Sequence, residues 1–407
     1  MQIAARKTLQ GLRVLEIGHF VAAPFATRLL ADQGADVIKI EPLEGDPARQ
    51  WGRQIDGKSL WWSAHARGKR CITLNLKDPR ARDAVLDLVA QSDAVIENFR
   101  PGQLERLGLG PDILRAKRPG LVIARISGYG QTGPYRDRAA FGVIGEALGG
   151  LRYLTNHAPG TTDLPPVRVG VSIGDSIAGL YAAFGVMAAL WQRDRSDGDG
   201  VGRTLDIALT ESVLSMMEGM LPEYDALGIV KQPTGGGIAT AAPSNAYRTR
   251  DGWVLIAANS NPLFARLMAL MDRPDLIDEP AYAGNATRVA HAEELDRLIG
   301  EWTLSFTSQQ LLERLEAADI PSAKAYTAAD CAQDEQYRFR GAVRGIFDPA
   351  FDREILHCGI VPQVVEDDAA LPLPGPAIGA DNEAILGDLL GYSDEKLAIL
   401  RAEGVIA

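Results

Sequence analysis

The residue of this chain best placed for chemistry is a carboxylate at the start of an apolar helix. Asp175 follows the turn Gly170-Val171-Ser172-Ile173-Gly174 and opens a run with almost no polar residue before Gln192. The unpaired N–H groups and the dipole at a helix start favour a negative charge there. Asp is also a common N-cap, so this position alone leaves a purely structural role open. The turn has the Gly-x-Ser-x-Gly form of a nucleophile elbow, but no His-bearing segment downstream stands out as a partner for Ser172.

The elements around Asp175 indicate an α/β domain. The apolar run predicts a helix of about 16 residues, apolar on nearly all sides and therefore interior, interrupted by glycines and short of a membrane span. Near the N-terminus, a strand at 12–18, a helix at 24–33 and a strand at 36–41 form a βαβ unit. The turn after the first strand has no G-x-G-x-x-G, which disfavours a nicotinamide dehydrogenase.

The alternation of strands and helices continues along the chain. We expect strands at 71–76, 94–98, 121–127 and 203–209, and helices at 79–90 and 210–219. This pattern predicts a doubly wound, Rossmann-like parallel sheet with helices on both faces and ligands near the carboxyl ends of its strands.

A second domain is expected from the length of 407 residues and from a change in the pattern of predicted strands and helices near Pro222. Strands at 244–249 and 253–258 around the turn Arg250-Asp251-Gly252 form a hairpin, and helices follow at 261–271, 291–302 and 307–318. We therefore predict a large domain at 1–222, a small α+β domain at 223–330, and a C-terminal segment at 331–407 with a Pro-rich crossing and two amphipathic helices.

Composition narrows the classes of partner. The net charge of -11 argues against nucleic acid or an anionic membrane, and the N-terminus has no apolar signal core, so we expect a cytoplasmic protein. The three cysteines and five histidines show no metal-ligand or disulfide spacing, so no metal is expected. Residues 1–150 carry 22 Lys and Arg against 16 Asp and Glu, which suits a polyanionic small ligand or reflects uneven surface charge.

Six segments, in this order, resemble the family III CoA-transferases (CaiB/BaiF type, including formyl-CoA and succinyl-CoA transferases). They are LQGLRVLEIGHFVAAPFATRLLADQGADVIKIEP at 9–42, GKRCITLNLK at 68–77, ENFRPGQLERLGLG at 97–110, SGYGQTGPY at 127–135, VGVSIGDSIAGL at 169–180 and GADNEAILGDLLGYSDEKL at 379–397. The resemblance implies a large domain made of both chain ends, a small domain between them, and a homodimer whose two subunits are interlocked.

The resemblance also implies roles for particular residues. Asp175 corresponds to the aspartate that forms covalent acyl and CoA intermediates, and Gly235, Gly236 and Gly237 to a loop that covers it and offers N–H groups to oxyanions. The implied CoA-binding residues are Leu74, Lys77, Asn98 and Arg106, with Lys69 and Arg70 as further candidates for the phosphates. Candidates for the acyl site are Val21, Trp61, Trp62, Ala139, Phe141 and Gly142. For most of these positions a structural role is the alternative, such as core packing for the tryptophans or a flexible interdomain turn for the glycines.

The reaction implied is transfer of CoA from succinyl-CoA or another short acyl-CoA to a carboxylic acid, a small dicarboxylate, through an aspartyl mixed anhydride and an aspartyl-CoA thioester. It needs no permanently bound cofactor. Ala139 and Gly142 stand where the formyl-CoA branch carries Lys and Glu, and Arg152 or Arg168 could meet a distal carboxylate. An α-methylacyl-CoA racemase is one alternative, disfavoured because residues 138–143 offer no titratable base for proton abstraction. A non-catalytic acyl-CoA-binding protein is the other.

Overall fold

The computed structural model describes residues 7–366 and 370–407, which form two compact units. The first unit comprises Met1–Leu151, Val169–Leu221 and Glu335–Ala407, so both ends of the chain belong to it. The second comprises Arg152–Arg168 and Pro222–Asp334. The second unit thus differs from the small domain predicted at 223–330 by also containing residues 152–168.

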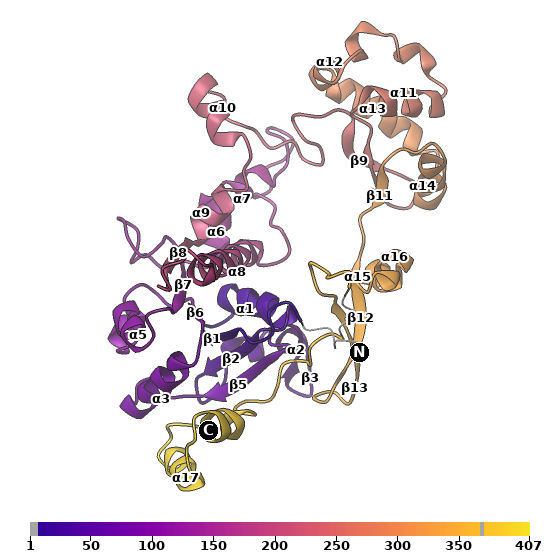
Figure 1. The fold of residues 1–407 in the computed structure, drawn as a ribbon. Helices are drawn as coiled ribbons and strands as arrows, with labels where there is room; N and C mark the ends of the chain where they lie inside the picture. The colour runs from indigo at the N-terminus through magenta and orange to yellow at the C-terminus, as the bar shows by residue number, and fades with distance from the viewer. Residues whose placement is uncertain (1–6, 367–369) are drawn as a thin grey trace. The chain divides into compact units, whose positions relative to one another are not determined.

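A six-stranded parallel sheet forms the first unit, with the strand order β5-β2-β1-β6-β7-β8 (Figure 1). This confirms the parallel α/β sheet predicted from the alternation of elements. The strands are β1 (Arg13–Ile17), β2 (Asp36–Glu41), β5 (Lys69–Thr73), β6 (Ala94–Glu97), β7 (Val122–Ser127) and β8 (Thr204–Ala208).

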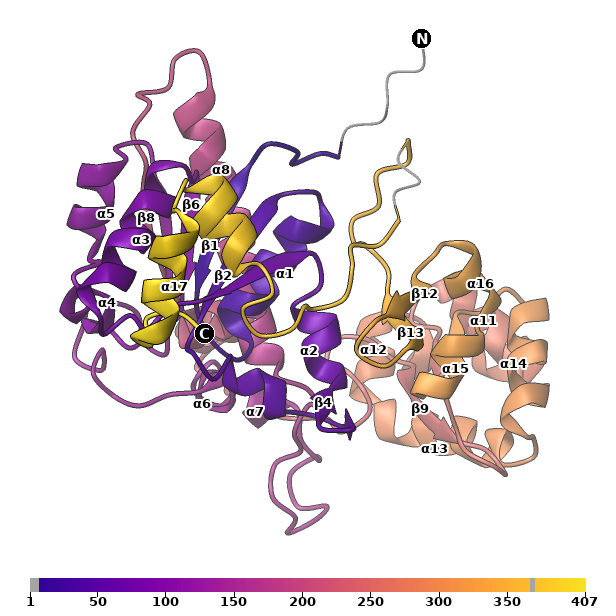
Figure 2. The same ribbon diagram turned by 90° about the horizontal axis from the view of Figure 1, so that it is seen from below.

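Helices cover both faces of this sheet because alternate strand residues point to opposite sides. Val14 and Val37 pack against α1 (Ala22–Asp32) and α8 (Ile173–Asp194). The neighbouring Leu15 and Ile38 face the other side. That side is covered by α3 (Pro79–Ala90), α4 (Gln103–Arg106), α5 (Pro111–Lys117), the π-helical turn η4 (Glu383–Leu389) and α17 (Asp394–Ala402). Figure 2 shows how α17 returns the C-terminus to the side of the sheet that carries α3.

The apolar helix α8 differs from the sequence expectation in length and burial. It has 22 residues rather than about 16, because the polar residues at its end continue the helix. Its small residues, such as Ala178, Gly179 and Ala182, are buried, whereas Leu180, Phe184 and Trp191 are exposed to 51%, 69% and 72%. The prediction of an interior helix is therefore correct for one face only. Among the described residues, α8 alone is long and apolar enough to pass a test for a membrane span, and a core helix passes the same test.

Local capping signals agree with the helix starts. Asp78 accepts a hydrogen bond from the Arg80 backbone N–H at 2.8 Å, and Pro79 follows as the first residue of α3. The other elements of the first unit are η1 (Pro47–Gln50), β3 (Gln54–Ile55), β4 (Lys58–Ser59), α2 (Leu60–His65), α6 (Gly142–Leu148), α9 (Leu209–Leu214), α16 (Glu335–Phe339), β12 (Val343–Asp348) and β13 (Arg353–Cys358). Helices α7 (Leu151–Leu154) and α10 (Met220–Leu227) begin in the first unit and continue into the second.

The second unit contains a three-stranded antiparallel sheet with the order β11-β10-β9. Strands β9 (Ser244–Arg248) and β10 (Trp253–Ala257) form the predicted hairpin, and β11 (Ser322–Lys324) pairs with β10. The helices of this unit are α11 (Asn261–Leu270), α12 (Asn285–Ala290), α13 (Ala292–Thr303), α14 (Ser308–Ala317) and α15 (Ala328–Gln333), with 3₁₀ turns η2 (Pro274–Leu276) and η3 (Pro280–Tyr282). Their apolar faces enclose a separate core that includes Phe264 and Leu311.

Candidate active site

The strand order places a topological switch point between β1 and β6. The chain moves from β1 towards one edge of the sheet and later returns to the other side of β1 with β6. In doubly wound sheets, ligands bind outside the carboxyl ends of the strands at such a point. The segments at this position are residues 18–21 after β1 and residues 98–100 after β6.

The side chain of Asn98 holds the turn after β1. Its Oδ1 accepts a hydrogen bond from the His19 N–H at 2.9 Å, and its Nδ2 donates to the His19 carbonyl at 2.9 Å. A Cβ at Gly18 would lie 2.6 Å from Asn98 Oδ1 and 2.6 Å from Ala23 Cβ, so only glycine fits there. Asn98, the predicted CoA ligand, therefore uses its amide to fix the backbone of the turn.

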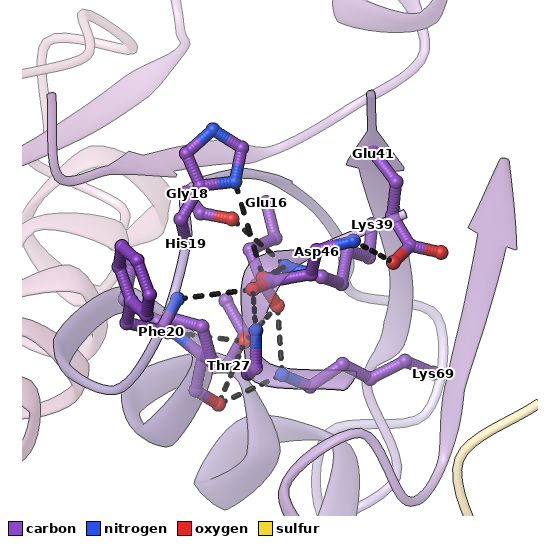
Figure 3. A network of polar contacts seen from close by, with 12 residues as sticks. Glu16, Gly18, His19, Phe20, Thr27, Lys39, Glu41, Asp46 and Lys69 are labelled. Carbon is purple, nitrogen blue, oxygen red and sulfur yellow. Dashed lines mark hydrogen bonds and ion pairs between the residues drawn. The ribbon is translucent and has the colours of Figure 1, made fainter. Parts of the chain in front are cut away.

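A buried cluster of charges lies under the same turn (Figure 3). Glu16 and Lys39 are register partners on β1 and β2, and Lys39 Nζ lies 2.5 Å from Glu16 Oε1 and 2.7 Å from Asp46 Oδ2. Lys69 Nζ donates to Glu16 Oε2 at 2.7 Å. Lys39 also donates to the Gly18 carbonyl at 2.8 Å. The cluster thus supports the turn through backbone contacts.

The pKa values in this cluster follow from its burial and pairing. Burial would raise the pKa of Glu16, but the neighbouring Lys39 and Lys69 outweigh it and lower that pKa. Burial lowers the pKa of Lys69, while Lys39, close to Glu16 and Asp46, has a raised pKa despite burial. Lys69 is buried and paired with Glu16, which favours a structural role, and its contact with CoA phosphates stays a prediction. On the same strand, Arg70 Nε donates to Asp36 Oδ1 at 2.9 Å.

Asp46 also holds Phe20 in an unusual backbone conformation. The Phe20 N–H donates to Asp46 Oδ1 at 3.2 Å, and Phe20 has a φ of 64°, in the left-handed region that large side chains rarely adopt. His19 beside it is mostly buried, and this burial lowers the pKa of its imidazole. The ring centroids of His19 and Phe99 are 5.4 Å apart. The next residue, Val21, is buried at the N-cap of α1.

Asp175 lies in the first turn of α8 and is partly exposed. A Cβ at Gly142, the first residue of α6, would overlap the Asp175 carboxylate, and a Cβ at Gly174 would lie 2.7 Å from the Gly142 carbonyl oxygen. The two glycines therefore bring the start of α6 against the start of α8. This close approach places the Asp175 carboxylate beside the Gly142 backbone.

Helices α1 and α8 both begin at the carboxyl edge of the sheet, because connecting helices run back towards the amino edge. They pack closely, since a Cβ at Gly179 would lie 2.6 Å from the Ala22 carbonyl oxygen. Gly179 is one turn after Asp175, and Ala22 follows the turn of residues 18–21. Asp175 and the switch point thus lie at the same edge of the first unit.

A row of aromatic side chains extends from the residue before Gly142. The ring centroids of Phe141 and Phe20 are 6.4 Å apart, and those of Phe20 and Trp51 are 4.8 Å apart. Trp61 lies 5.9 Å from Trp51 and 5.4 Å from His65. Phe141 is 65% exposed, so this row offers an apolar surface near Asp175.

The other acyl-site candidates lie in different surroundings. Trp62 is buried and donates from Nε1 to the Pro376 carbonyl at 2.8 Å. The guanidinium carbon of Arg49 lies over its ring, 3.6 Å from the ring centroid. Trp62 lines a cavity of about 870 Å³ beside the Pro-rich segment, and Asp175 is not among the lining residues of that cavity. Ala139 is exposed in the loop before α6.

Exposed basic side chains surround the end of β6 and the short helix α4. A Cβ at Gly102 would lie 3.3 Å from Arg106 Nη1 and 3.9 Å from Arg136 Nη2, so these two guanidinium groups flank Gly102. Arg100 and Lys77 are also exposed, whereas Leu74 is buried and donates its N–H to the Glu41 carbonyl at 2.9 Å. Sequence reasoning missed Arg136, because only the fold brings its loop beside α4. It missed Phe20 and Trp51 for the same reason.

The glycine loop belongs to the second unit. The Gly235 N–H donates to the Asn156 carbonyl at 3.2 Å, and Thr234 Oγ1 donates to the Gly237 carbonyl at 2.8 Å. A Cβ at Gly236 would lie 2.7 Å from Asn245 Oδ1, so the loop packs tightly on β9. Arg152 and Arg168 are in the same unit. In the described part of the chain, no group of three or more His, Cys, Asp or Glu side chains could hold a metal ion.

Comparison with known proteins adds to this geometry. Residues 9–382 match the sequence profile of CoA-transferase family III. The chain is 45% identical over 98% of both chains to the succinyl-CoA–D-citramalate CoA-transferase of Chloroflexus aurantiacus. It is 37% identical over 98% of both chains to the succinyl-CoA–L-malate CoA-transferase beta subunit of the same organism. The crystal structure of a CAIB/BAIF family protein from Brucella suis is 31% identical and superimposes with a TM-score of 0.82, covering 95% of this chain and 100% of that one.

Proposed function

Because this chain belongs to CoA-transferase family III and is a CoA-transferase, we propose that it moves CoA from succinyl-CoA to a short dicarboxylic acid through Asp175. The observation that carries the assignment of Asp175 is its position. It is a partly exposed carboxylate in the first turn of α8, against the Gly142 backbone and at the ligand-binding edge of the sheet.

The proposed reaction begins with attack of an Asp175 carboxylate oxygen on the thioester carbonyl of succinyl-CoA. The C–S bond breaks, CoA leaves as a thiolate, and a mixed anhydride joins Asp175 to the succinyl group. The thiolate then attacks the aspartyl carbonyl, which releases succinate and leaves CoA as a thioester on Asp175. Each step exchanges one acyl bond for another, so no redox or metal cofactor is needed.

The acceptor acid reverses these steps. Its carboxylate attacks the aspartyl thioester and expels CoA thiolate, which forms a second mixed anhydride. The thiolate then attacks the carbonyl of the acceptor, which leaves as the new acyl-CoA and restores the Asp175 carboxylate. Water would hydrolyse these intermediates, so the site must exclude it. As the family resemblance implies, we assign this role to the glycine loop of residues 235–237, in which the N–H groups of Gly236 and Gly237 would also stabilise the oxyanions.

The assignment of the CoA end rests on charge. Arg106, with Arg136 beside it across Gly102, and the exposed Lys77 would meet the phosphates of CoA. The Asn98 amide would act through the turn that it holds, and Leu74 through its backbone only, because its side chain is buried.

The acceptor we propose is a short dicarboxylate that carries a hydroxyl group. D-citramalate and L-malate, the acids in the names of the two relatives, share this chemistry. The aromatic row from Phe141 to Trp61 would contact the apolar part of the acyl group, while Arg152 or Arg168 would pair with the distal carboxylate. Val21, Ala139 and Gly142 complete the proposed acyl site.

We also propose that the enzyme is a cytoplasmic homodimer, with interlocked subunits as the family resemblance implies. The exposed face of α8 supports a partner, because Leu180, Phe184 and Trp191 lie on one side of the helix and are all more than half exposed. A second copy of the chain is the occupant that we assign to this face.

The test is to trap the aspartyl intermediates. Incubation with succinyl-CoA and hydroxylamine should convert Asp175 to a hydroxamate that is detectable by mass spectrometry of the peptide. Asp175→Ala should abolish both the hydroxamate and transfer to D-citramalate, whereas Asp112→Ala, whose carboxylate on α5 is 99% exposed, should preserve both. Modification at another residue, or full transfer by Asp175→Ala, would reject the mechanism. CoA binding without transfer to any acid would identify a non-catalytic binder.

A further inference from the structure

Arg125 joins two acidic residues, Glu97 at the end of β6 and Glu105 in α4. Its guanidinium donates from Nε to Glu97 Oε1 at 2.8 Å, and from Nη1 and Nη2 to the two Glu105 oxygens at 2.8 and 3.1 Å. The Arg125 side chain is only 7% exposed, although it is located on the strand next to β6. The bidentate contact fixes the orientation of the Glu105 carboxylate as well as its distance, and the single bond from Nε holds Glu97.

Each partner of Arg125 is adjacent to a residue of the site. Glu97 ends β6, and its Oε2 accepts a hydrogen bond from the Phe99 N–H at 2.7 Å. This contact fixes the backbone directly after Asn98, the residue that holds the turn of His19. Glu105 directly precedes Arg106 on α4. Arg125 therefore links two of the segments that carry the proposed contacts to CoA.

Helix α4 needs such a link. It has four residues, which is too short to be stable by itself, and its Ncap is Gly102 with a φ of 80° and no side-chain cap. Leu104 fixes one side of the helix in the core. The pairing of Glu105 with Arg125 holds the helix directly beside Arg106.

We propose that Arg125 is a positioning residue for the CoA substrate, which orients Arg106 through Glu105 and the Asn98–Phe99 backbone through Glu97. The inference rests on the proposed function, in that CoA or its thioester is the ligand at this edge. Arg125 touches no substrate in this scheme, and its effect is on affinity for the phosphate-bearing end of CoA.

The experiment measures the Kd for CoA by calorimetry, and KM and kcat with succinyl-CoA and D-citramalate. Arg125→Lys keeps the charge and removes the fork, and Glu105→Gln weakens only the link to α4 and leaves the buried Arg125–Glu97 pair in place. Each variant should raise the Kd for CoA and the KM for succinyl-CoA about tenfold, as expected for one misplaced charge-assisted contact. The kcat at saturation and the KM for D-citramalate should stay within about twofold, because the reacting end is not displaced.

A matched control lies near the end of α8, beside the amino end of β6. Arg193 also links two carboxylates, Asp93 at 3.3 Å and Asp194 at 2.6 Å, with a side chain that is 11% exposed. Arg193→Lys should change thermal stability without changing the Kd for CoA. A purely structural role for Arg125 predicts the same result for Arg125→Lys.

A double-mutant cycle gives the sharper test. Arg106→Ala should weaken CoA binding in the wild type and in Arg193→Lys alike, but should add less than about twofold in Glu105→Gln, where Arg106 is already misplaced. Additive losses in Glu105→Gln, or an unchanged Kd in both Arg125→Lys and Glu105→Gln, would overturn the inference. If affinity depends on Arg125 but the wild type transfers CoA to no acid, the proposed reaction fails and the positioning role stands.

Discussion

The buried charge cluster gives the prediction that separates a structural lysine from a phosphate-binding one. Lys39 and Lys69 balance Glu16 and Asp46, so the four side chains together carry no net charge. Lys69→Met leaves two carboxylates with one lysine, all buried, and removing one partner of a buried ion pair costs about 3–5 kcal/mol. We therefore expect Lys69→Met to lower the free energy of unfolding of the first unit by about that amount.

The double variant Glu16→Gln with Lys69→Met tests the cause of this loss. It leaves Lys39 paired with Asp46 at 2.7 Å and restores charge balance, so it should be more stable than Lys69→Met alone. Arg70→Met, one residue further along the same strand, is the matched control. Its side chain is 34% exposed and pairs with Asp36, so its loss should cost less than about 1 kcal/mol.

The assay is urea-induced unfolding followed by tryptophan fluorescence and far-UV circular dichroism, together with the KM for succinyl-CoA. If Lys69→Met unfolds like the wild type but has a markedly higher KM, Lys69 meets the phosphates and the reasoning from burial is refuted. Equal stability of the single and double variants would refute the charge-balance argument.

Three further predictions follow from other parts of the first unit. Burial raises the pKa of Glu97 to about 7 from its ordinary 4.5, so Glu97 keeps its proton in the folded state at pH values where the unfolded chain loses it. The free energy of unfolding should therefore fall by about 3 kcal/mol as pH rises from about 4.5 through about 7, and unfolding of Glu97→Gln should lack this fall. Gly18→Ala should destabilise the protein by about 1–3 kcal/mol in thermal unfolding, because the added Cβ would lie 2.6 Å from both Ala23 Cβ and Asn98 Oδ1. Gly300→Ala, whose Cβ would meet no atom within 4 Å, should be neutral or stabilising, and equal effects of the two substitutions would contradict the packing argument. Phe184→Glu should convert the proposed homodimer to monomers in sedimentation velocity, and an unchanged sedimentation coefficient would exclude this face of α8 as the contact.

Local patterns in the sequence predicted the elements of the sheet well. Strand β2 was expected at residues 36–41 and is found there, because Val37, Lys39 and Glu41 alternate with Ile38 and Ile40 as a strand requires. Helix α3 was expected from Pro79 to Ala90 and has those bounds, since an Asp-Pro start fixes its first turn. The hairpin of β12 and β13 was not predicted, because no short glycine turn marks it.

The pairing of charges between distant segments could not be predicted from the sequence. The sequence offered Lys69 as a candidate for the CoA phosphates, and only the order β5-β2-β1 brings it to Glu16. The same holds for Asn98, whose amide partner His19 is 79 residues away, and for Arg125 with its two glutamates. The exposed face of α8 was also missed, because the apolar composition of a helix does not distinguish a buried face from an exposed one.

The position of the C-terminal helices has a consequence for synthesis on the ribosome. Ile385, Leu397 and Ile406 cover the side of the sheet that contains Leu15, yet they are translated long after β1 and β2. Until they emerge, the nascent strands present an uncovered apolar surface that invites chaperones and aggregation. We expect nascent chains that are arrested before residue 380 to bind ribosome-associated chaperones. This binding should end once the C-terminal helices have emerged from the ribosome.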